Sequence, residues 1–149
     1  MTDRYVVVIT GSRSWETEKQ RQTILDAMIK QLQVAKSYGD APDYWDDGKK
    51  YKSKPKPVLF VLGCANGVDS MAKSIAENNL WNYVIEYARW EALGKAAGPE
   101  RNARMLSHGT SVVLAFSDDF TYSKGTANCI KQAKAMGSTI IMYSSEEAT

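Results

Sequence analysis

The chain has 149 residues, the usual size of one domain and enough to bury a hydrophobic core. Apolar residues make up 44% of it and charged residues 24%, ordinary values for a soluble globular protein, and no apolar run approaches the length that spans a bilayer. The net charge of +2 is too small to indicate a nucleic-acid partner by itself.

Cysteine and histidine usage argues against a metal site. Cys64 and Cys129 lie far apart without the spacing of metal ligands, and His108 is the one histidine of the chain. We therefore expect no metal, no cofactor and two reduced thiols. The residues after Met1 lead at once into a short apolar segment rather than a signal-peptide core, so we expect a cytoplasmic protein.

Short apolar segments rich in β-branched residues recur along the chain. Several are apolar almost throughout, as expected for strands that helices cover on both faces. They predict strands at residues 5–10, 58–63, 81–87, 111–116 and 139–143.

Segments with helical periodicity lie between the predicted strands. Apolar residues over positions 24–32 recur at i, i+4 and i+8, on one face of a helix. Residues 68–79 and 99–108 predict two more helices, and the second opens with proline, which suits a helix start. Residues 127–136 predict a fourth helix, which ends at Gly137.

This alternation predicts an α/β fold, a Rossmann-like three-layer α/β/α domain with a mostly parallel five-stranded sheet. Right-handed crossovers place helices on both faces of such a sheet. We expect one domain over residues 1–149. Residues 38–57 break the alternation and predict a long insertion loop.

The insertion is rich in charge. Five lysines interleave with Tyr51 and suggest a nucleic-acid groove, but four aspartates in the same segment offset them. We therefore favour a solvated or unstructured insertion and do not expect nucleic acid as a partner. An alternative is that Tyr44 and Trp45 form a lid over a ligand.

Ligands of open α/β sheets bind beyond the carboxyl ends of the strands, so the turns after the strands are candidate sites. The first strand leads into Gly11, Ser12 and Arg13. Glycine lets the backbone approach a ligand, serine offers a hydroxyl, and arginine can bind a phosphate with two N–H groups. The turn lacks the G-x-G-x-x-G dinucleotide fingerprint and is weak evidence alone.

The second strand leads into a turn of small residues and then a helix. Backbone N–H groups at a helix start attract an anion, although the same residues also suit a plain tight turn. The carboxylate of Asp69 would repel a phosphate and is suited to a ribose hydroxyl instead. The candidate ligand-binding residues are Gly63, Ala65, Asn66, Gly67 and Asp69.

The turn after the third strand combines cations, an amide, glycines and a helix start, which together can wrap an anionic ligand. A lone lysine or arginine is usually a solvated surface charge, so the indication comes from the combination. Either Trp90 or Trp15 would pack near a base. The candidates are Trp90, Lys95, Gly98, Arg101 and Asn102.

The loop after the fourth strand ends in Ser123, Gly125 and Thr126, at a predicted helix start. These residue types at the amino terminus of a helix are typical of a phosphate cradle. Their order does not match a Walker motif. The alternative is that Thr126 is an ordinary N-cap.

Six short motifs follow one another over residues 11–137. They are Gly11-Ser12-Arg13, Gly63-x-Ala65-x-Gly67-x-Asp69, Ala88-x-Trp90, Gly94-Lys95-x-Ala97-Gly98-x-x-Arg101-Asn102-x-x-Met105, Ala115-Phe116 and Ser123-x-Gly125-Thr126. This series resembles the YspA-like branch of the SLOG superfamily, relatives of the LOG and DprA proteins. The resemblance implies a Rossmann-like domain whose glycine-rich loops bind nucleotides or nucleotide-derived signals, in bacterial or phage proteins of conflict or stress signalling.

The chain departs from the resemblance at a catalytic position. Phosphoribohydrolases of the LOG type have a Pro-Gly-Gly-x-Gly-Thr-x-x-Glu signature whose glutamate belongs to the catalytic centre, and Cys129 falls at that place here. The resemblance therefore supports the phosphate cradle without the usual hydrolytic acid. Cys64 also replaces a glycine that is common in the branch.

Two functions stay open. In the first, the domain is a sensor or sequestering protein that binds a nucleotide-like small molecule. In the second, it is an N-glycosidic hydrolase of a nucleoside monophosphate or related nucleotide, with Asp69 or Glu100 as the carboxylate that an oxocarbenium-like transition state requires. We expect no membrane partner, and a homodimer or higher homo-oligomer is the default assembly.

Overall fold

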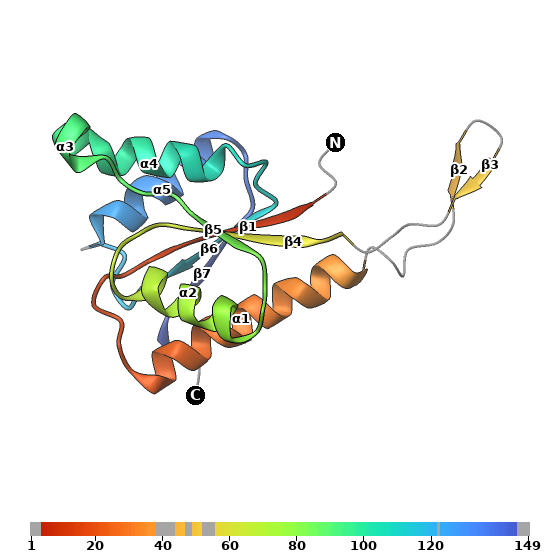
Figure 1. Cartoon of the computed structure of the whole chain (residues 1–149), viewed down its shortest axis with the longest axis horizontal. Coiled ribbons are helices and arrows are strands. Elements are labelled where there is room, and N and C mark those ends of the chain that lie inside the picture. The colour runs from red at the N-terminus through yellow and green to blue at the C-terminus, as the bar shows by residue number, and fades with distance from the viewer. Residues whose placement is uncertain (1–3, 38–43, 47–48, 52–55, 122, 146–149) are drawn as a thin grey trace.

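A parallel sheet forms the centre of the protein (Figure 1). The computed structural model describes residues 4–37, 44–46, 49–51, 56–121 and 123–145. The sheet consists of β1 (Tyr5–Gly11), β4 (Val58–Leu62), β5 (Tyr83–Ile85), β6 (Val112–Phe116) and β7 (Ile140–Tyr143). Its strand order is β5-β4-β1-β6-β7, and every neighbouring pair is parallel.

Each strand of this sheet corresponds to one of the predicted apolar segments, and the α/β fold class is confirmed. β1 lies in the middle, where Val7 pairs with Phe60 on one side and with Val112 on the other. β5 is shorter than the predicted segment 81–87, and its side chains are partly exposed because it lies at the edge of the sheet.

Helices cover both faces of the sheet. They are α1 (Glu18–Ser37), α2 (Val68–Asn78), α3 (Trp90–Leu93), α4 (Ala97–Leu106) and α5 (Lys124–Ala135), with a 3-10 turn at Gly94–Ala96. Side chains alternate along β1: Tyr5, Val7 and Ile9 join the core under α1 and α2, whereas Val6 and Val8 join the core under α4 and α5. Full burial of such apolar side chains contributes roughly 1.5–3 kcal/mol each.

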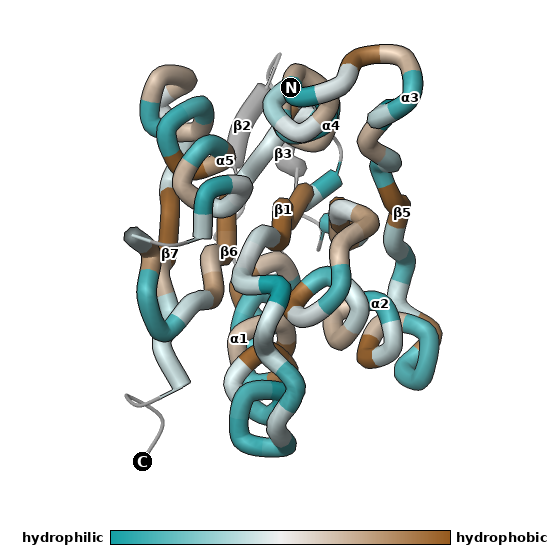
Figure 2. Tube along the Cα trace, turned by 90° about the vertical axis from the view of Figure 1, so that its left-hand side faces the viewer, coloured by the Kyte–Doolittle hydropathy of each residue, from teal (hydrophilic) through white to brown (hydrophobic). Residues whose placement is uncertain are grey.

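Figure 2 views the molecule from the side at which the strands end. Apolar stretches lie along β1, β5, β6 and β7, and the helices carry apolar residues on part of their circumference. None of the helices in the described ranges is both long and apolar enough to cross a bilayer.

The start of α1 has a sequence signal that our prediction did not use. Thr17 Oγ1 accepts the N–H of Gln20 at 3.1 Å, and Gln20 Oε1 accepts the N–H of Thr17 at 3.0 Å, which is a capping box. The buried face of α1 also differs from the predicted stripe, because Ile24 and Met28 are buried while Ile29 is 38% exposed.

α4 and α5 begin earlier than predicted. α4 starts at Ala97, so Pro99 lies in its first turn, where no intrahelical hydrogen bond needs its missing N–H. α5 starts at Lys124 rather than at residue 127, so Gly125 and Thr126 belong to its first turn. The apolar period that predicted both helices is absent from these first turns.

The prediction of an unstructured insertion over residues 38–57 is wrong for its described part. Strands β2 (Tyr44–Asp46) and β3 (Lys49–Tyr51) pair in antiparallel fashion as a separate two-stranded sheet. The insertion joins the end of α1 to the start of β4, at the edge of the main sheet where its strands begin. The proposed lid function of Tyr44 and Trp45 concerns side chains outside those that the structure describes.

Candidate functional site

A cavity lies where the strand order reverses. From β1 the chain builds β4 and β5 on one side of the sheet, and then crosses to β6 and β7 on the other side. Open α/β sheets bind ligands at this switch point, beyond the carboxyl ends of the strands. The cavity has a volume of about 600 Å³, within the range of small-molecule sites. The turn after β1, the loop after β6 and the first turn of α5 line it.

The turn after β1 is held tightly against β6. A Cβ on Gly11 would lie 2.5 Å from the Phe116 carbonyl oxygen, so glycine is required there for close packing. The Ser12 N–H donates to the same oxygen at 2.8 Å. This anchoring leaves Ser12 and the exposed Arg13 side chain on the wall of the cavity.

The turn before α2 is closed by protein rather than open to a ligand. Gly67 has a φ of 75°, and a Cβ there would lie 2.3 Å from the Ser12 carbonyl oxygen. That oxygen accepts the Val68 N–H at 3.0 Å. Of the residues predicted here, Ala65 and Asp69 line the cavity, whereas Gly63, Asn66 and Gly67 do not.

Asp69 lies in the first turn of α2, buried at the wall of the cavity. It is 6% exposed, and its Oδ2 accepts the Ala65 N–H at 3.1 Å. Burial raises the pKa of Asp69 to about 6, against the opposing effects of the Ala65 N–H and of the nearby Arg101 and Arg13 guanidinium groups. A carboxyl with this pKa can gain or release a proton near neutral pH.

Arg101 reaches the cavity from α4 and is 6% exposed. Its Nη1 lies 3.7 Å from Cys64 Sγ, and its Nε donates to Asn102 Oδ1 at 3.1 Å. Gly63 makes room for this side chain, since a Cβ on Gly63 would lie 2.8 Å from Arg101 Nη1 and 2.6 Å from Asp69 Oδ2. Asn102 does not line the cavity, and it contacts Arg101 through this hydrogen bond.

The first turn of α5 offers unpaired N–H groups to the cavity. Ser123, not Thr126, is the N-cap, so the alternative interpretation of Thr126 is wrong. Ser123 Oγ lies 3.1 Å from Ser117 Oγ and makes no capping hydrogen bond. Among the described residues, the N–H groups of Lys124, Gly125 and Thr126 meet no acceptor, and all three residues line the cavity.

Three of the residues predicted after β5 lie outside the cavity. Trp90 is in α3, Lys95 is in the 3-10 turn, and Gly98 is in α4, where a Cβ would meet the Trp90 ring at 3.6 Å. α3 and the 3-10 turn replace the open anion-wrapping turn that the glycines predicted. None of these three residues lines the cavity.

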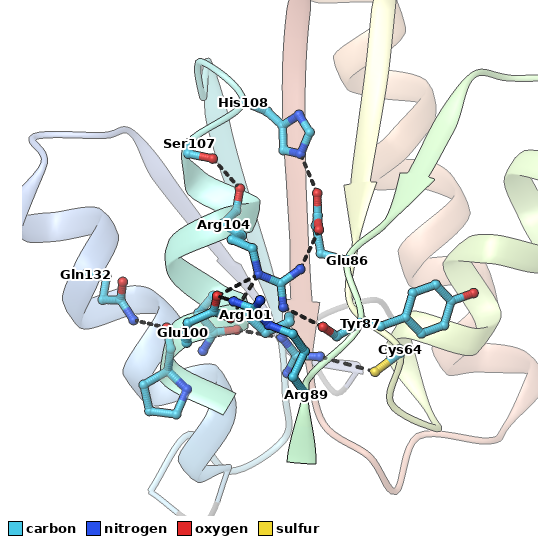
Figure 3. A network of polar contacts seen from close by, with 12 residues as sticks. Cys64, Glu86, Tyr87, Arg89, Glu100, Arg101, Arg104, Ser107, His108 and Gln132 are labelled. Carbon is cyan, nitrogen blue, oxygen red and sulfur yellow. Dashed lines mark hydrogen bonds and ion pairs between the residues drawn. The ribbon is translucent and has the colours of Figure 1, made fainter. Parts of the chain in front are cut away.

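Glu100 belongs to an ion-pair network beside α4 (Figure 3). Its carboxylate binds Arg89 and lies 2.8 Å from Arg104 Nε. Arg104 Nη1 in turn lies 2.7 Å from Glu86, which contacts His108 at 2.8 Å. Hydrogen bonding from Arg104 lowers the pKa of Glu100. The Glu100 carboxylate therefore helps to join α4 to the segment after β5.

The loop after β6 adds polar residues that our prediction did not include. Asp118 Oδ1 accepts the N–H and the hydroxyl of Ser145 at 2.8 Å and 2.7 Å, and Gln20 Nε2 donates to Oδ2 at 3.2 Å. Partial burial alone would raise the pKa of Asp118, but these hydrogen bonds lower it. Gln20, Ser117, Asp118 and Asp119 line the cavity. Two features of the sequence could have predicted these residues: the capping box that includes Gln20, and the two aspartates shortly after β6.

Cys129, which falls at the place of the LOG glutamate, is a core residue. It is fully buried beside Val6 and Val8. Burial raises the pKa of its thiol to about 11, so the group stays protonated at neutral pH. It supplies no substitute for a hydrolytic acid.

Comparison with known proteins places the fold and the family. No protein-family model matches the chain. The fold is similar to that of DNA processing protein A (DprA) from Streptococcus pneumoniae, with a TM-score of 0.59 and 14% sequence identity over 93% of this chain. The chain spans half the length of that DprA chain, and the likeness is one of fold. In sequence, it is 32% identical over 142 residues to the Gene 61 protein of Mycobacterium phage D29, covering 92% of this chain and 94% of the phage protein. The chain belongs to the same family as this phage protein.

Proposed function

We propose that the cavity binds the phosphate group of a nucleotide or nucleotide-derived small molecule, which the protein senses or sequesters. The observation that carries this proposal is the first turn of α5, whose N–H groups face the cavity without acceptors in the described part of the chain. A helix amino terminus with free N–H groups favours an anion. Arg13, Arg101 and Lys124 add positive charge around it.

The two helix amino termini at the cavity suggest how the ligand is oriented. Neither terminus has a side-chain cap, but their surroundings differ. At α2 the Ser12 carbonyl oxygen accepts the Val68 N–H and the buried Asp69 carboxyl lies in the first turn, whereas the first-turn N–H groups of α5 meet no acceptor among the described residues. A phosphate therefore belongs at α5. Asp69 is suited to accept a ribose hydroxyl, away from the phosphate it would repel.

The family assignment within SLOG is also a proposal. The DprA-like fold and the ordered motif series support the YspA-like branch. A cytoplasmic location and a homo-oligomeric assembly remain separate proposals, the second because homodimers are the commonest soluble assembly. DprA is named for DNA processing, so the expectation from charge that nucleic acid is no partner is not supported. A ligand screen should therefore contain a single-stranded oligonucleotide beside mononucleotides and dinucleotides.

Calorimetric titration tests the proposal. Nucleotides from such a panel should bind, and replacing Arg13 or Thr126 with alanine should weaken binding by about 1–3 kcal/mol, the usual contribution of a charge-assisted or buried hydrogen bond. Lys95→Ala is the matched control, because Lys95 is an exposed cation outside the cavity. Equal affinities in all three variants and the parent would refute the site.

Hydrolysis of an N-glycosidic bond is the second candidate, favoured by the raised pKa of Asp69. A carboxyl that ionises near pH 6 could protonate a leaving base or stabilise an oxocarbenium ion. Released base in incubations with nucleoside monophosphates, abolished in Asp69→Asn and retained in Glu100→Gln, would support it. Glu100 serves as the control because Arg89 and Arg104 occupy its carboxylate outside the cavity. Nucleotide recovered intact would leave binding as the function.

A further inference from the structure

Asn102 is a buried amide that uses both of its ends. It is 2% exposed, and its Oδ1 accepts Arg101 Nε–H at 3.1 Å. Its Nδ2 donates to the Gly125 carbonyl oxygen and to Asn128 Oδ1, each at 3.1 Å. One side chain on α4 therefore joins the guanidinium at the cavity to the first turn of α5.

Asn102 joins two groups that lie on different helices, the Arg101 guanidinium on α4 and the first turn of α5, and both would bind an anion. Arg101 lines the cavity from α4, and Gly125 lies in the turn of α5 whose N–H groups face the same cavity. An arginine side chain has several rotatable bonds, and fixing it before a ligand arrives removes an entropic cost from binding. A hydrogen bond at Nε also fixes the plane of the guanidinium.

We infer that Asn102 is a positioning residue that holds the Arg101 guanidinium and the amino terminus of α5 together as one composite anion site. The inference rests on the proposed function, because it assumes that the cavity takes an anion. It replaces the sequence-based expectation that Asn102 itself touches the ligand.

The competing explanation is that Asn102 only joins α4 to α5. Gln132 also joins these two helices, so a Gln132 variant tests that explanation separately. Gln132 Nε2 on α5 donates to the Pro99 carbonyl oxygen at 3.0 Å (Figure 3) and to Asn128 Oδ1 at 2.7 Å. Gln132 thus joins α5 to α4 and shares the Asn128 acceptor with Asn102. The hydrogen bonds of Gln132 reach neither Arg101 nor Gly125. Gln132→Ala is therefore a matched control for the loss of an amide link between the two helices.

The first readout is binding of inorganic phosphate and adenosine monophosphate, measured by calorimetry. Asn102→Ala should weaken phosphate binding by about tenfold, inside the range for residues of one hydrogen-bonded network, while Gln132→Ala stays within about twofold of the parent. Combined with Arg101→Ala, Asn102→Ala should add little further loss, because the two residues act as a unit. Equal affinity in Asn102→Ala and Gln132→Ala, or full additivity with Arg101→Ala, would overturn the inference.

The second readout needs no ligand and separates this inference from the proposed function. The Arg101 Nε–H resonance should exchange slowly with water in the parent protein and in Gln132→Ala, and rapidly in Asn102→Ala. Asn102→Asp keeps an acceptor for Nε–H, so it should keep the slow resonance, and it serves if the alanine variant fails to fold. Slow exchange in Asn102→Ala would refute the positioning role. Absence of phosphate and nucleotide binding in the parent would instead refute the proposed function.

Discussion

Asp69 is the residue at which burial and charge oppose each other most directly. Its carboxyl is removed from water, and the Ala65 N–H, Arg101 and Arg13 compensate for that burial in part, so its pKa rises to about 6. The free energy of unfolding must then depend on pH, because the folded protein binds a proton more tightly than the unfolded chain does.

We predict that this dependence appears between about pH 4 and pH 6. The folded pKa exceeds the ordinary value of 3.8, so the contribution of protonated Asp69 is complete below about pH 4 and is lost as the pH rises through 6. The loss should amount to roughly 2–3 kcal/mol at 1.36 kcal/mol per pKa unit. Urea unfolding of the parent and of Asp69→Asn over this range measures it as the difference between the two curves.

Asp118→Asn is the control for this measurement. The pKa of Asp118 is lowered from 3.8, so the stability contributed by its carboxylate is complete above that ordinary value and is lost as the pH falls from it through the lower folded value. The Asp118→Asn curve should therefore run parallel to the parent between pH 4 and pH 6. Parallel curves for the parent and Asp69→Asn would show that Asp69 ionises normally.

Residues that follow a strand directly could be predicted as site residues from the sequence. Arg13 and Asp69 line the cavity because parallel strands end at one edge of the sheet. Trp90 and Lys95 carry equally suggestive side chains, but α3 and the 3-10 turn take them away from the cavity. The course of such a short helical excursion depends on tertiary contacts such as the ion pairs of Glu100, which no local pattern reveals.

At the scale of elements, the glycines divide into those required by packing and those that are not. Gly67 combines a φ of 75° with backbone atoms of Ser12 and Arg13 within 2.6 Å of a Cβ position. Gly125, in the first turn of α5, has no atom within 4 Å of a Cβ position. Gly67 packs the turn after β1 against the start of α2, whereas Gly125 leaves open space beside the cavity.

We predict opposite effects of alanine at these two positions. Gly67→Ala should lower the free energy of unfolding by at least about 2 kcal/mol, because it adds a clash to a left-handed backbone. Gly125→Ala should raise it by about 0.5–1 kcal/mol, since alanine favours a helix. Chemical denaturation of both variants checks the pair. A neutral Gly67→Ala would mean that the turn after β1 does not press on α2.

The start of α5 shows why helix boundaries at the site were harder to predict than helix interiors. The apolar period begins after Thr126 because Lys124 and Gly125 are exposed and Thr126, the buried residue of this turn, is polar. Its N–H groups are open to the cavity because no preceding helical turn supplies acceptors and Ser123 makes no capping hydrogen bond. Polar first turns at ligand sites are therefore missed by periodicity for a physical reason.

At the scale of the whole molecule, the strand segments could be predicted but their order could not. Apolar runs locate each strand in the chain, whereas the order β5-β4-β1-β6-β7 depends on which face each crossover helix covers. That order creates the switch point between β1 and β6 and brings together residues that lie more than a hundred positions apart, such as Gly11 and Thr126. The cavity is a property of the topology.

Backbone amide NMR during titration with a nucleoside monophosphate tests the central claim most directly. An anion at the cavity should shift the N–H resonances of residues 12–13 and 124–126 together, along one binding curve, and leave those of α3 unchanged. Shifts confined to other surfaces, or no shift at millimolar nucleotide and phosphate concentrations, would contradict the account.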